Sequence, residues 1–224
     1  MPGVFVTGTD TGVGKTLVAC ALLRRLAADG ASTVGMKPVA AGCEQTPAGR
    51  TNEDVEALIA ASTVRADPAL VNPYALREAI APHLAAAHES VRIDLEHLVA
   101  CYTRLAGIAR WVVVEGVGGF RVPLNESHDA ADLARMLALP VVLVVGMRLG
   151  CLNHATLTRE AIASRGLGLA GWVANRIDPA MARCDENIEF LKRALDAPFL
   201  GEIPHVEHAE GRLQTAIDVI SFPG

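Results

Sequence analysis

The 224-residue sequence has few aromatic residues, only 4% of the chain, so its core must be built from Val, Leu, Ile and Ala. Its five cysteines are odd in number and contain no Cys-x-x-Cys pair, so neither a disulfide framework nor a zinc site is expected. It has no basic run and a net charge of −5, which argues against nucleic acid as a main partner. No apolar stretch reaches the roughly 18 residues of a membrane span. A strand begins almost at once, with no basic segment followed by an apolar one, so we expect a cytoplasmic protein with no membrane partner.

The remaining composition is that of a globular protein with a buried sheet, because 51% of the residues are hydrophobic and 20% are charged. A chain of 224 residues suits one sizeable core, so we expect a single domain over residues 1–224. Strand-like and helix-like segments alternate from end to end. This pattern predicts an α/β fold with one doubly wound, mainly parallel sheet and helices on both faces. The expected strands are residues 4–7, 33–39, 111–114, 140–146, 169–174 and 199–200, and the expected helices are 17–28, 53–59, 95–109, 132–137, 151–162 and 213–220; residues 41–52 and 68–90 are expected to be irregular.

The most informative stretch is residues 8–16, GTDTGVGKT, which follows the apolar run 4–7 and precedes a predicted helix. A strand, a glycine-bearing loop and Gly-Lys-Thr at a helix start are typical of the phosphate loop of P-loop NTPases. The backbone N–H groups can wrap a phosphate, Lys15 would neutralise the outer phosphates, and the Thr16 hydroxyl would bind magnesium. The usual spacing puts a glycine at position 9, where this chain has Thr9 and carries Gly8 instead. The alternative is a chance glycine-rich turn; the working assumption is a nucleoside triphosphate site in a P-loop NTPase-like fold.

Three further charged residues follow predicted strands or open a predicted helix. Lys37 ends the strand expected at 33–39, where ligands of open α/β sheets gather, although an exposed lysine in a turn is the alternative. Asp54 lies in the first turn of a helix capped by Asn52, so it either stabilises the positive helix end or contributes to a magnesium site. Glu115 follows the buried run 111–114 and precedes glycines, as does the acid that holds magnesium opposite a phosphate loop. A lone Glu after a strand is usually a surface residue, but the phosphate loop favours the metal-linked interpretation.

Two later segments could bind ligands. Residues 150–153 would lie at a helix N-terminus, where free N–H groups can accept a carboxylate. Asn175 follows the strand expected at 169–174, and its amide could either read a purine edge or cap a turn. His83 and His88 stand in a segment with turn signals and are interpreted as structural rather than catalytic.

These motifs together resemble one family, dethiobiotin synthetase, over nearly the whole chain. Several separate motifs in the right order are more specific than a phosphate loop alone. They are FVTGTDT (5–11), KPV (37–39), VEG (114–116), LGCLNH (149–154), AGWVAN (170–175) and GEIP (201–204). Members of this family are ATP-dependent enzymes that close the ureido ring in the penultimate step of biotin synthesis.

The resemblance implies an ATP- and Mg²⁺-dependent ligase that forms C–N bonds. In this family 7,8-diaminopelargonate adds CO₂, supplied from bicarbonate, to form a carbamate on one amine. ATP phosphorylates the carbamate, giving a carbamic-phosphoric anhydride, and the second amine then attacks with release of phosphate and formation of dethiobiotin. The resemblance also implies a homodimer with the substrate site at the subunit interface.

The resemblance implies roles for particular residues. Lys37 and Lys15 would be catalytic, bracketing the γ-phosphate and the carbamate. The magnesium ligands would be Thr16, Asp54 and Glu115. The nucleotide would contact Gly12, Val13, Gly14, Lys15, Thr16, Leu17, Asp54, Glu115, Gly116, Val117, Gly118, Asn175, Arg176, Pro204, His205 and Val206. The substrate would contact Thr11, Ala41, Gly150, Cys151, Leu152 and Asn153, the last four in the neighbouring subunit.

The sequence departs from the family pattern at two positions and leaves two rival functions. Ala41 stands where members usually carry a small hydroxyl residue, and Gly12 where some carry an acid. A switch ATPase of the partition or nitrogenase-reductase type would carry a lysine four residues before the last loop glycine, where this chain has Asp10. A cobyrinate-type synthetase would need a glutaminase domain, for which 224 residues leave no room. A pure binding module would not need two lysines and two acids around one phosphate.

Overall fold

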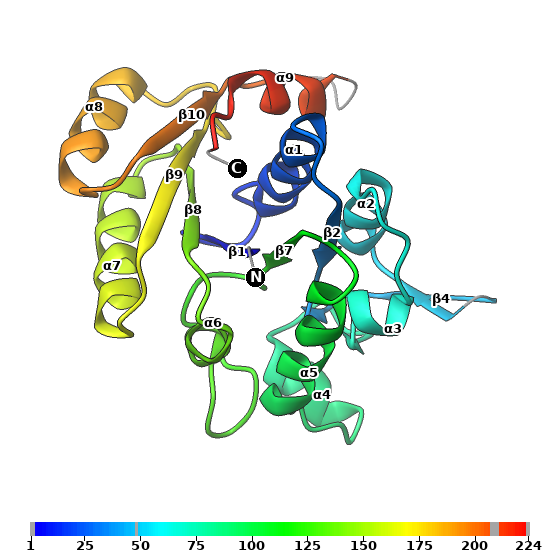
Figure 1. Cartoon of the computed structure of the whole chain (residues 1–224). Helices are drawn as coiled ribbons and strands as arrows, with labels where there is room; N and C mark the ends of the chain where they lie inside the picture. Colours follow the sequence, from blue (N-terminus) through cyan, green and yellow to red (C-terminus); the bar gives the residue numbers. More distant parts are fainter. Residues whose placement is uncertain (1–2, 48, 207–210, 223–224) are drawn as a thin grey trace.

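The computed structural model describes residues 3–47, 49–206 and 211–222. At its centre lies a six-stranded, wholly parallel sheet with the strand order β10-β9-β8-β1-β7-β2 (Figure 1). The strands are β1 (Gly3–Gly8), β2 (Thr33–Met36), β7 (Trp111–Glu115), β8 (Val141–Gly146), β9 (Leu169–Asn175) and β10 (Phe199–Ile203). All six were expected from the sequence, although β2 ends at Met36 and β10 continues to Ile203.

Helices cover both faces of this sheet. The helices of the described chain are α1 (Lys15–Ala28), α2 (Glu53–Ala61), α3 (Pro68–Val71), α4 (Pro82–His88), α5 (Leu95–Ala106), α6 (Ala130–Leu137), α7 (Cys151–Ser164), α8 (Cys184–Ala194) and α9 (Arg212–Val219). Successive strand residues point to opposite faces. Val4 and Val6 therefore pack in one apolar cluster with α1, α2 and α9, whereas Phe5 packs in a second with α5 and α6. Near the β10 edge of the sheet, Trp172 of β9 packs against α7 and α8. This arrangement confirms the doubly wound α/β fold.

The segment expected to be irregular between residues 68 and 90 contains two helices and a short strand, so that expectation is wrong. Pro68 and Pro82 are each the first residue of a helix. Proline fits that position because its missing N–H would have no partner inside the helix and its fixed φ is already helical. Pro82, which belongs to one of the turn signals of this segment, therefore marks a helix start. Strand β6 (Tyr74–Ala75) lies between the two helices and pairs with β3 (Val39–Ala40).

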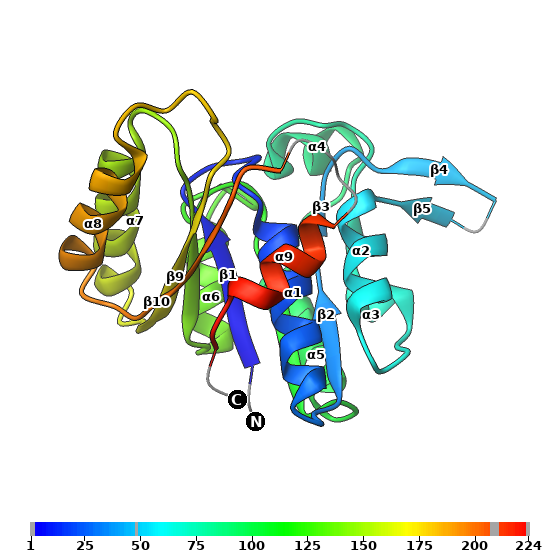
Figure 2. The same cartoon turned by 90° about the horizontal axis from the view of Figure 1, so that it is seen from above.

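Two other elements differ from the expectation. The segment 41–52 holds an antiparallel hairpin of β4 (Glu44–Thr46) and β5 (Gly49–Thr51), which projects from the body of the molecule in Figure 2. Helix α8 was not expected, although its buried Ile188 and Leu191 are three residues apart and its first turn is acidic. These signals are short and separated by charged residues, so periodicity alone did not reveal them.

The strand order decides where the functional residues meet. Because β7 lies between β1 and β2, the loops that leave the carboxyl ends of these three strands are neighbours. The phosphate loop follows β1, Lys37 directly follows β2, and Glu115 is the last residue of β7. Ligands of parallel sheets bind at this edge.

Candidate active site

The phosphate loop runs from the end of β1 at Gly8 to the start of α1 at Lys15. Gly14 is the N-cap of α1 and has a φ of 93°, a conformation that side chains rarely adopt. A Cβ at this position would lie 2.2 Å from Nδ2 of Asn175, so only glycine fits. Nδ2 of Asn175 donates a hydrogen bond to the carbonyl oxygen of Val13 at 2.8 Å, which ties the loop to the end of β9. The loop geometry is thus set by one glycine and one buried amide.

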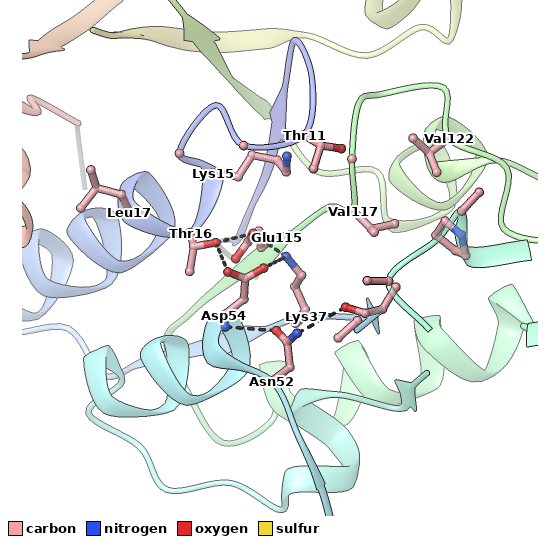
Figure 3. Close-up of a pocket in the computed structure, with 18 of the residues that line it drawn as sticks. Thr11, Lys15, Thr16, Leu17, Lys37, Asn52, Asp54, Glu115, Val117 and Val122 are labelled. Carbon is pink, nitrogen blue, oxygen red and sulfur yellow. Dashed lines mark hydrogen bonds and ion pairs between the residues drawn. The ribbon is translucent and has the colours of Figure 1, made fainter. Parts of the chain in front are cut away.

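Four side chains converge beside the loop, as Figure 3 shows. The Lys37 ammonium lies 2.7 Å from Oδ2 of Asp54 and 2.5 Å from Oε1 of Glu115. The Thr16 hydroxyl lies 2.7 Å from Oδ1 of Asp54 and 2.9 Å from Oε1 of Glu115. These residues come from α1, β7, the first turn of α2 and the end of β2. The fold therefore assembles the lysine, hydroxyl and two acids that were predicted from separate motifs.

Burial shifts the pKa values in this cluster. Burial raises the pKa of the Glu115 carboxyl above its ordinary value, even though the ammonium of Lys37 counters it. Burial also disfavours the charge of Lys37, but Glu115 and Asp54 together outweigh it and raise the pKa of this lysine. The pKa of Asp54 is lowered, because Lys37 and Thr16 overcome the effect of its partial burial. Lys37 thus holds its proton between the two acids.

Lys15 lies at the same site but outside this ion pair. Its ammonium donates a hydrogen bond to the carbonyl oxygen of Asp10 at 2.9 Å. Burial, followed by repulsion from Lys37, lowers the pKa of Lys15 to about 8. The ammonium groups of the two lysines therefore repel each other, and an anion bound between them would relieve this repulsion.

The oxygen atoms of Thr16, Asp54 and Glu115 form a donor set that fits magnesium, a hard cation that prefers oxygen ligands. Among the described residues, the second oxygen of Glu115, Oε2, is buried without a hydrogen-bond partner. A buried oxygen without a partner costs free energy unless a bound ligand or ion interacts with it. No group of three or more His, Cys, Asp or Glu side chains that could by itself hold a metal ion occurs in the described parts of the chain. Two carboxylates and a hydroxyl suit magnesium that takes its other ligands from phosphate and water.

A pocket of about 930 Å³ contains this cluster. Of the residues expected to bind ligands, it is lined by Thr11, Gly12, Gly14, Lys15, Thr16, Leu17, Lys37, Ala41, Asp54, Glu115, Val117, Gly118 and Asn175. Its other walls were not foreseen: they are Ala40, Asn52, Ala79, Ile80, Ala81, Pro82, Val122, Arg212 and Leu213. Asn52 was identified only as a helix cap. It does cap α2, accepting from the backbone N of Asp54 at 3.0 Å, and its Nδ2 also donates to the carbonyl oxygen of Ala41 at 3.4 Å.

Other expected site residues lie beside the pocket or away from it. Val13 is a buried residue of the loop itself, and Gly116 packs on Phe5. The Arg176 side chain is bound to Glu202 and Asp185, and these hydrogen bonds raise its pKa. The Arg176 carbonyl oxygen is 3.3 Å from Nδ1 of His205, so Arg176 braces the segment that contains Pro204, His205 and Val206.

The segment 150–153 opens α7 and does not line the pocket of its own chain. Gly150 is the N-cap of α7 with a φ of 94°, and the residue before it, Leu149, is 95% exposed. Further along the same helix Leu157 is 56% exposed. Within one chain, the residues expected to contact the substrate from a neighbouring subunit do not reach the pocket. They are Gly150, Cys151, Leu152 and Asn153.

The fold and the site together define the chain as a P-loop NTPase-type domain: a parallel sheet with a phosphate loop after its first strand and an acid at the end of a neighbouring strand. Solved structures with this architecture include the septum site-determining protein MinD of Pyrococcus horikoshii, described as a complex with Mg-ADP. It matches with a TM-score of 0.60 and 16% identity over 96% of this chain and 86% of that chain. The cell division ATPase MinD of Pyrococcus furiosus matches with a TM-score of 0.60 and 16% identity over 97% and 89%. At this identity the likeness shows the fold alone.

A family model described as an AAA domain matches residues 2–212. The ATP-dependent dethiobiotin synthetase BioD of Aromatoleum aromaticum is 59% identical over 92% of both chains. The enzymes of the same name from Xanthomonas oryzae pv. oryzae and Ralstonia nicotianae are 53% identical over 95% of both chains, and 54% identical over 93% of this chain and 91% of the relative. The chain belongs to the ATP-dependent dethiobiotin synthetase family, as the resemblance of its motifs predicted.

Proposed function

We propose that this enzyme closes 7,8-diaminopelargonate and CO₂ to dethiobiotin with the use of Mg-ATP. One amine of the substrate attacks CO₂ and loses a proton, giving a carbamate. A carbamate oxygen attacks the γ-phosphorus of ATP, ADP leaves, and a carbamic-phosphoric anhydride forms. The second amine then attacks the carbonyl carbon and phosphate leaves. The observation that carries the proposal is the convergence of Lys15, Lys37 and two carboxylates on one pocket of a chain from this family.

The phosphate loop and the end of β9 would hold the nucleotide. Loop N–H groups and the start of α1 would bind the phosphates, from Gly12 to Leu17. Asn175 is a candidate for reading adenine, because Oδ1 is buried without a partner in the described chain while Nδ2 is committed to the loop. An acceptor of this kind fits an exocyclic amine. Pro204, His205 and Val206 would border the base beyond β10.

Thr16, Asp54 and Glu115 would hold Mg²⁺, which supplies charge neutralisation at the phosphates when bound. Lys37 shares the same two acids in this structure. If both acids served as ligands of a divalent ion, the Lys37 ammonium would be free to pair with an oxygen of the carbamate or of the transferring phosphoryl group. Lys15 would pair with the outer phosphates from the other side. Two fixed ammonium groups in a site of low water content stabilise charge that develops during transfer.

The substrate would lie between the phosphate loop and an apolar wall. Thr11 and Gly118 line the pocket, and so do the apolar residues Ala41, Ile80 and Pro82. An apolar wall suits the alkyl chain of the substrate. Ala41 offers no hydroxyl, so one hydrogen bond expected from the family pattern is replaced by packing.

The far carboxylate of the substrate would meet residues 150–153 of a neighbouring subunit. Backbone N–H groups at the start of α7 suit a carboxylate. The exposed side chains of Leu149, just before α7, and Leu157, within it, suit a subunit interface. This arrangement supports a homodimer with two shared substrate sites.

The test is product identity. The purified enzyme is incubated with Mg-ATP, 7,8-diaminopelargonate and carbon-13 bicarbonate, and the product is analysed by mass spectrometry. We expect dethiobiotin carrying one carbon-13 atom, formed only when all three are present. A product without the carbon-13 label, or no product beside steady ATP hydrolysis, would overturn the proposal; the second outcome would favour the switch ATPase.

A further inference from the structure

An acidic residue lies inside the phosphate loop, where an anion must bind. Asp10 is two residues beyond Gly8 and five before Lys15, and the two residues after it, Thr11 and Gly12, line the pocket. Its backbone is part of the site, because its carbonyl oxygen accepts a hydrogen bond from the ammonium of Lys15 at 2.9 Å. A carboxylate at this position would repel the phosphates of a nucleotide if its charge were left uncompensated.

Arg148 compensates this charge. Its guanidinium donates a hydrogen bond from Nη2 to Oδ2 of Asp10, across 138 positions of sequence. The other carboxylate oxygen, Oδ1, accepts from the backbone N of Thr11 at 2.7 Å. Both oxygens of Asp10 are therefore directed to fixed partners, one in the loop and one in a distant segment.

The backbone around Arg148 is fixed by the sheet. Strand β8 pairs with β1 in register up to Gly8, so the segment after β8 lies beside the phosphate loop. The backbone N of Met147 donates to the carbonyl oxygen of Asn175 at 2.8 Å, and the carbonyl oxygen of Arg148 accepts from the backbone N of Cys151 at 3.0 Å. Arg148 is thus held on both sides and presents its side chain to the loop without a large entropy cost.

We propose that Arg148 is a positioning residue for nucleotide binding: it neutralises Asp10 and holds the carboxylate away from the bound phosphates. The Asp10–Arg148 pair then fixes the peptide whose carbonyl oxygen orients Lys15. This inference deepens the proposed function and rests on nucleotide binding at the phosphate loop. The pair adds little to stability, because its side chains are 42% and 45% exposed and exposed ion pairs contribute little. Its effect belongs to ligand binding.

The test is a double-mutant cycle on the affinity for Mg-ADP, measured by titration calorimetry on the full chain. Arg148→Met leaves an uncompensated carboxylate in the loop and is expected to weaken binding about fivefold at low salt, with a smaller effect at high salt because of screening. Asp10→Asn removes the charge and is expected to bind Mg-ADP as tightly as the wild type or more tightly. The double variant Asp10→Asn/Arg148→Met is expected to recover to within about twofold of wild-type affinity, since the repulsion is gone.

A matched control exists at the other end of α1. The Arg25–Asp29 pair has nearly the same side-chain exposure, 43% and 48%, but lies at the C-terminal end of the helix that the phosphate loop opens. Arg25→Met is expected to leave Mg-ADP affinity unchanged. Arg148→Lys, which keeps the positive charge, is expected to bind like the wild type, and circular dichroism confirms that each variant is folded.

The outcomes separate the charge effect from a structural one. If Arg148→Met binds Mg-ADP as tightly as the wild type, or if the double variant binds as weakly as Arg148→Met at every salt concentration, the proposal is overturned. If the wild type itself does not bind Mg-ADP, both this inference and the proposed function fail. Normal wild-type binding with an unaffected Arg148→Met would overturn only the role of Arg148.

Discussion

At the scale of single residues, the side chain of Lys37 is held tightly by its neighbours in the site. It is buried, and its ammonium contacts carboxylates from two different elements at 2.5 and 2.7 Å. A buried ion pair is a weak contributor to stability, so the presence of three charges here points to chemistry rather than to folding. The two acids proposed as magnesium ligands are thus also the ion-pair partners of the proposed catalytic lysine.

The first prediction concerns Lys37→Ala. We expect a folded enzyme that still binds Mg-ADP but whose kcat is lower by about two to three orders of magnitude, since a preorganised cation is lost from the transition state. Steady-state kinetics and calorimetry measure the two properties separately. The control is Lys192→Met, at an exposed lysine of α8 that pairs with Glu189. This variant should keep the wild-type kcat. Full activity of Lys37→Ala would remove this lysine from the mechanism.

The second prediction concerns Glu115→Gln. This change keeps the shape but removes the charge of a carboxylate whose Oε2 is buried without a partner in the described chain. We expect the magnesium concentration needed for tight ADP binding to rise at least about tenfold, the scale on which lost support of a metal site is felt. ADP binding without magnesium should not weaken, because a negative charge has been removed. Unchanged magnesium dependence would place the ion elsewhere.

Residues of the site differ in how far the sequence could predict them. Lys37, Asp54 and Glu115 each stand at the end of a buried strand or at the start of a helix, and the topology of a parallel sheet then brings them together. Ile80, Pro82 and Arg212 carry no such local signal. They reach the pocket only because α4 and α9 pack where they do, which depends on tertiary contacts far from the motifs.

At the scale of elements, α6 shows how a helix start stabilises the face of the sheet opposite α1. Asp129 is its N-cap and forms a capping box with Asp132: each side chain accepts a hydrogen bond from the other residue's backbone N–H, at 2.9 and 3.0 Å. Arg165, just beyond α7, binds both carboxylates and so ties α7 to α6. Burial alone would raise the pKa of Asp132, but the hydrogen bond at Asp129 and the charge of Arg165 lower it.

The third prediction follows from this cap. Asp132→Asn removes the charge that faces Arg165, and we expect it to lower the free energy of unfolding at pH 7 by about 1 to 3 kcal/mol. Because the folded pKa of Asp132 lies below the ordinary value of 3.8, its contribution is present above that pH and is lost as the pH falls through the folded value. The difference between wild type and variant should therefore shrink below about pH 4 in urea denaturation.

The control for that experiment is Asp196→Asn. Asp196 is an exposed residue with a φ of 47°, a conformation that Asn tolerates, and its oxygen is 3.9 Å from Arg159. The free energy of unfolding of the Asp196→Asn variant should stay within about 0.5 kcal/mol of the wild-type value. A pH-independent loss in Asp132→Asn would show that packing, not charge, explains the effect.

Elements with a long apolar run were predictable and short ones were not. Strands β7 and β8 were predictable because each is a Val-rich run, as expected of a strand that is buried on both faces. Helices α3 and α4 have only four and seven residues and begin at proline, so a turn and a helix start looked alike in the sequence. The hairpin of β4 and β5 has no buried face to impose a pattern.

At the scale of the whole molecule, one chain supplies the nucleotide site but not every group proposed for the substrate. The phosphate loop, Lys37 and the two acids all line one pocket, whereas residues 150–153 open a helix whose preceding residue, Leu149, is 95% exposed. A second copy that covers Leu149 and Leu157 would bring this helix start to its neighbour. Within the described parts of the chain, no helix is long and apolar enough to span a membrane.

The fourth prediction tests this dimer. The double variant Leu149→Glu/Leu157→Glu is expected to sediment as a monomer, to bind Mg-ADP normally, and to show a KM for diaminopelargonate raised at least about tenfold, because the carboxylate loses its partner subunit. Ile108→Glu, at a residue that is 50% exposed between α5 and β7, is the matched control and should remain dimeric and active. A monomeric double variant with wild-type kinetics would confine the whole substrate site to one chain.

The central claim is that ATP is consumed only to close the ring. The measurement that tests it most directly is phosphate release from Mg-ATP, with and without diaminopelargonate and bicarbonate. We predict release that requires both compounds and matches dethiobiotin formation one for one. Release that is slow and indifferent to both would contradict the account, since the same fold would then be using ATP as a switch.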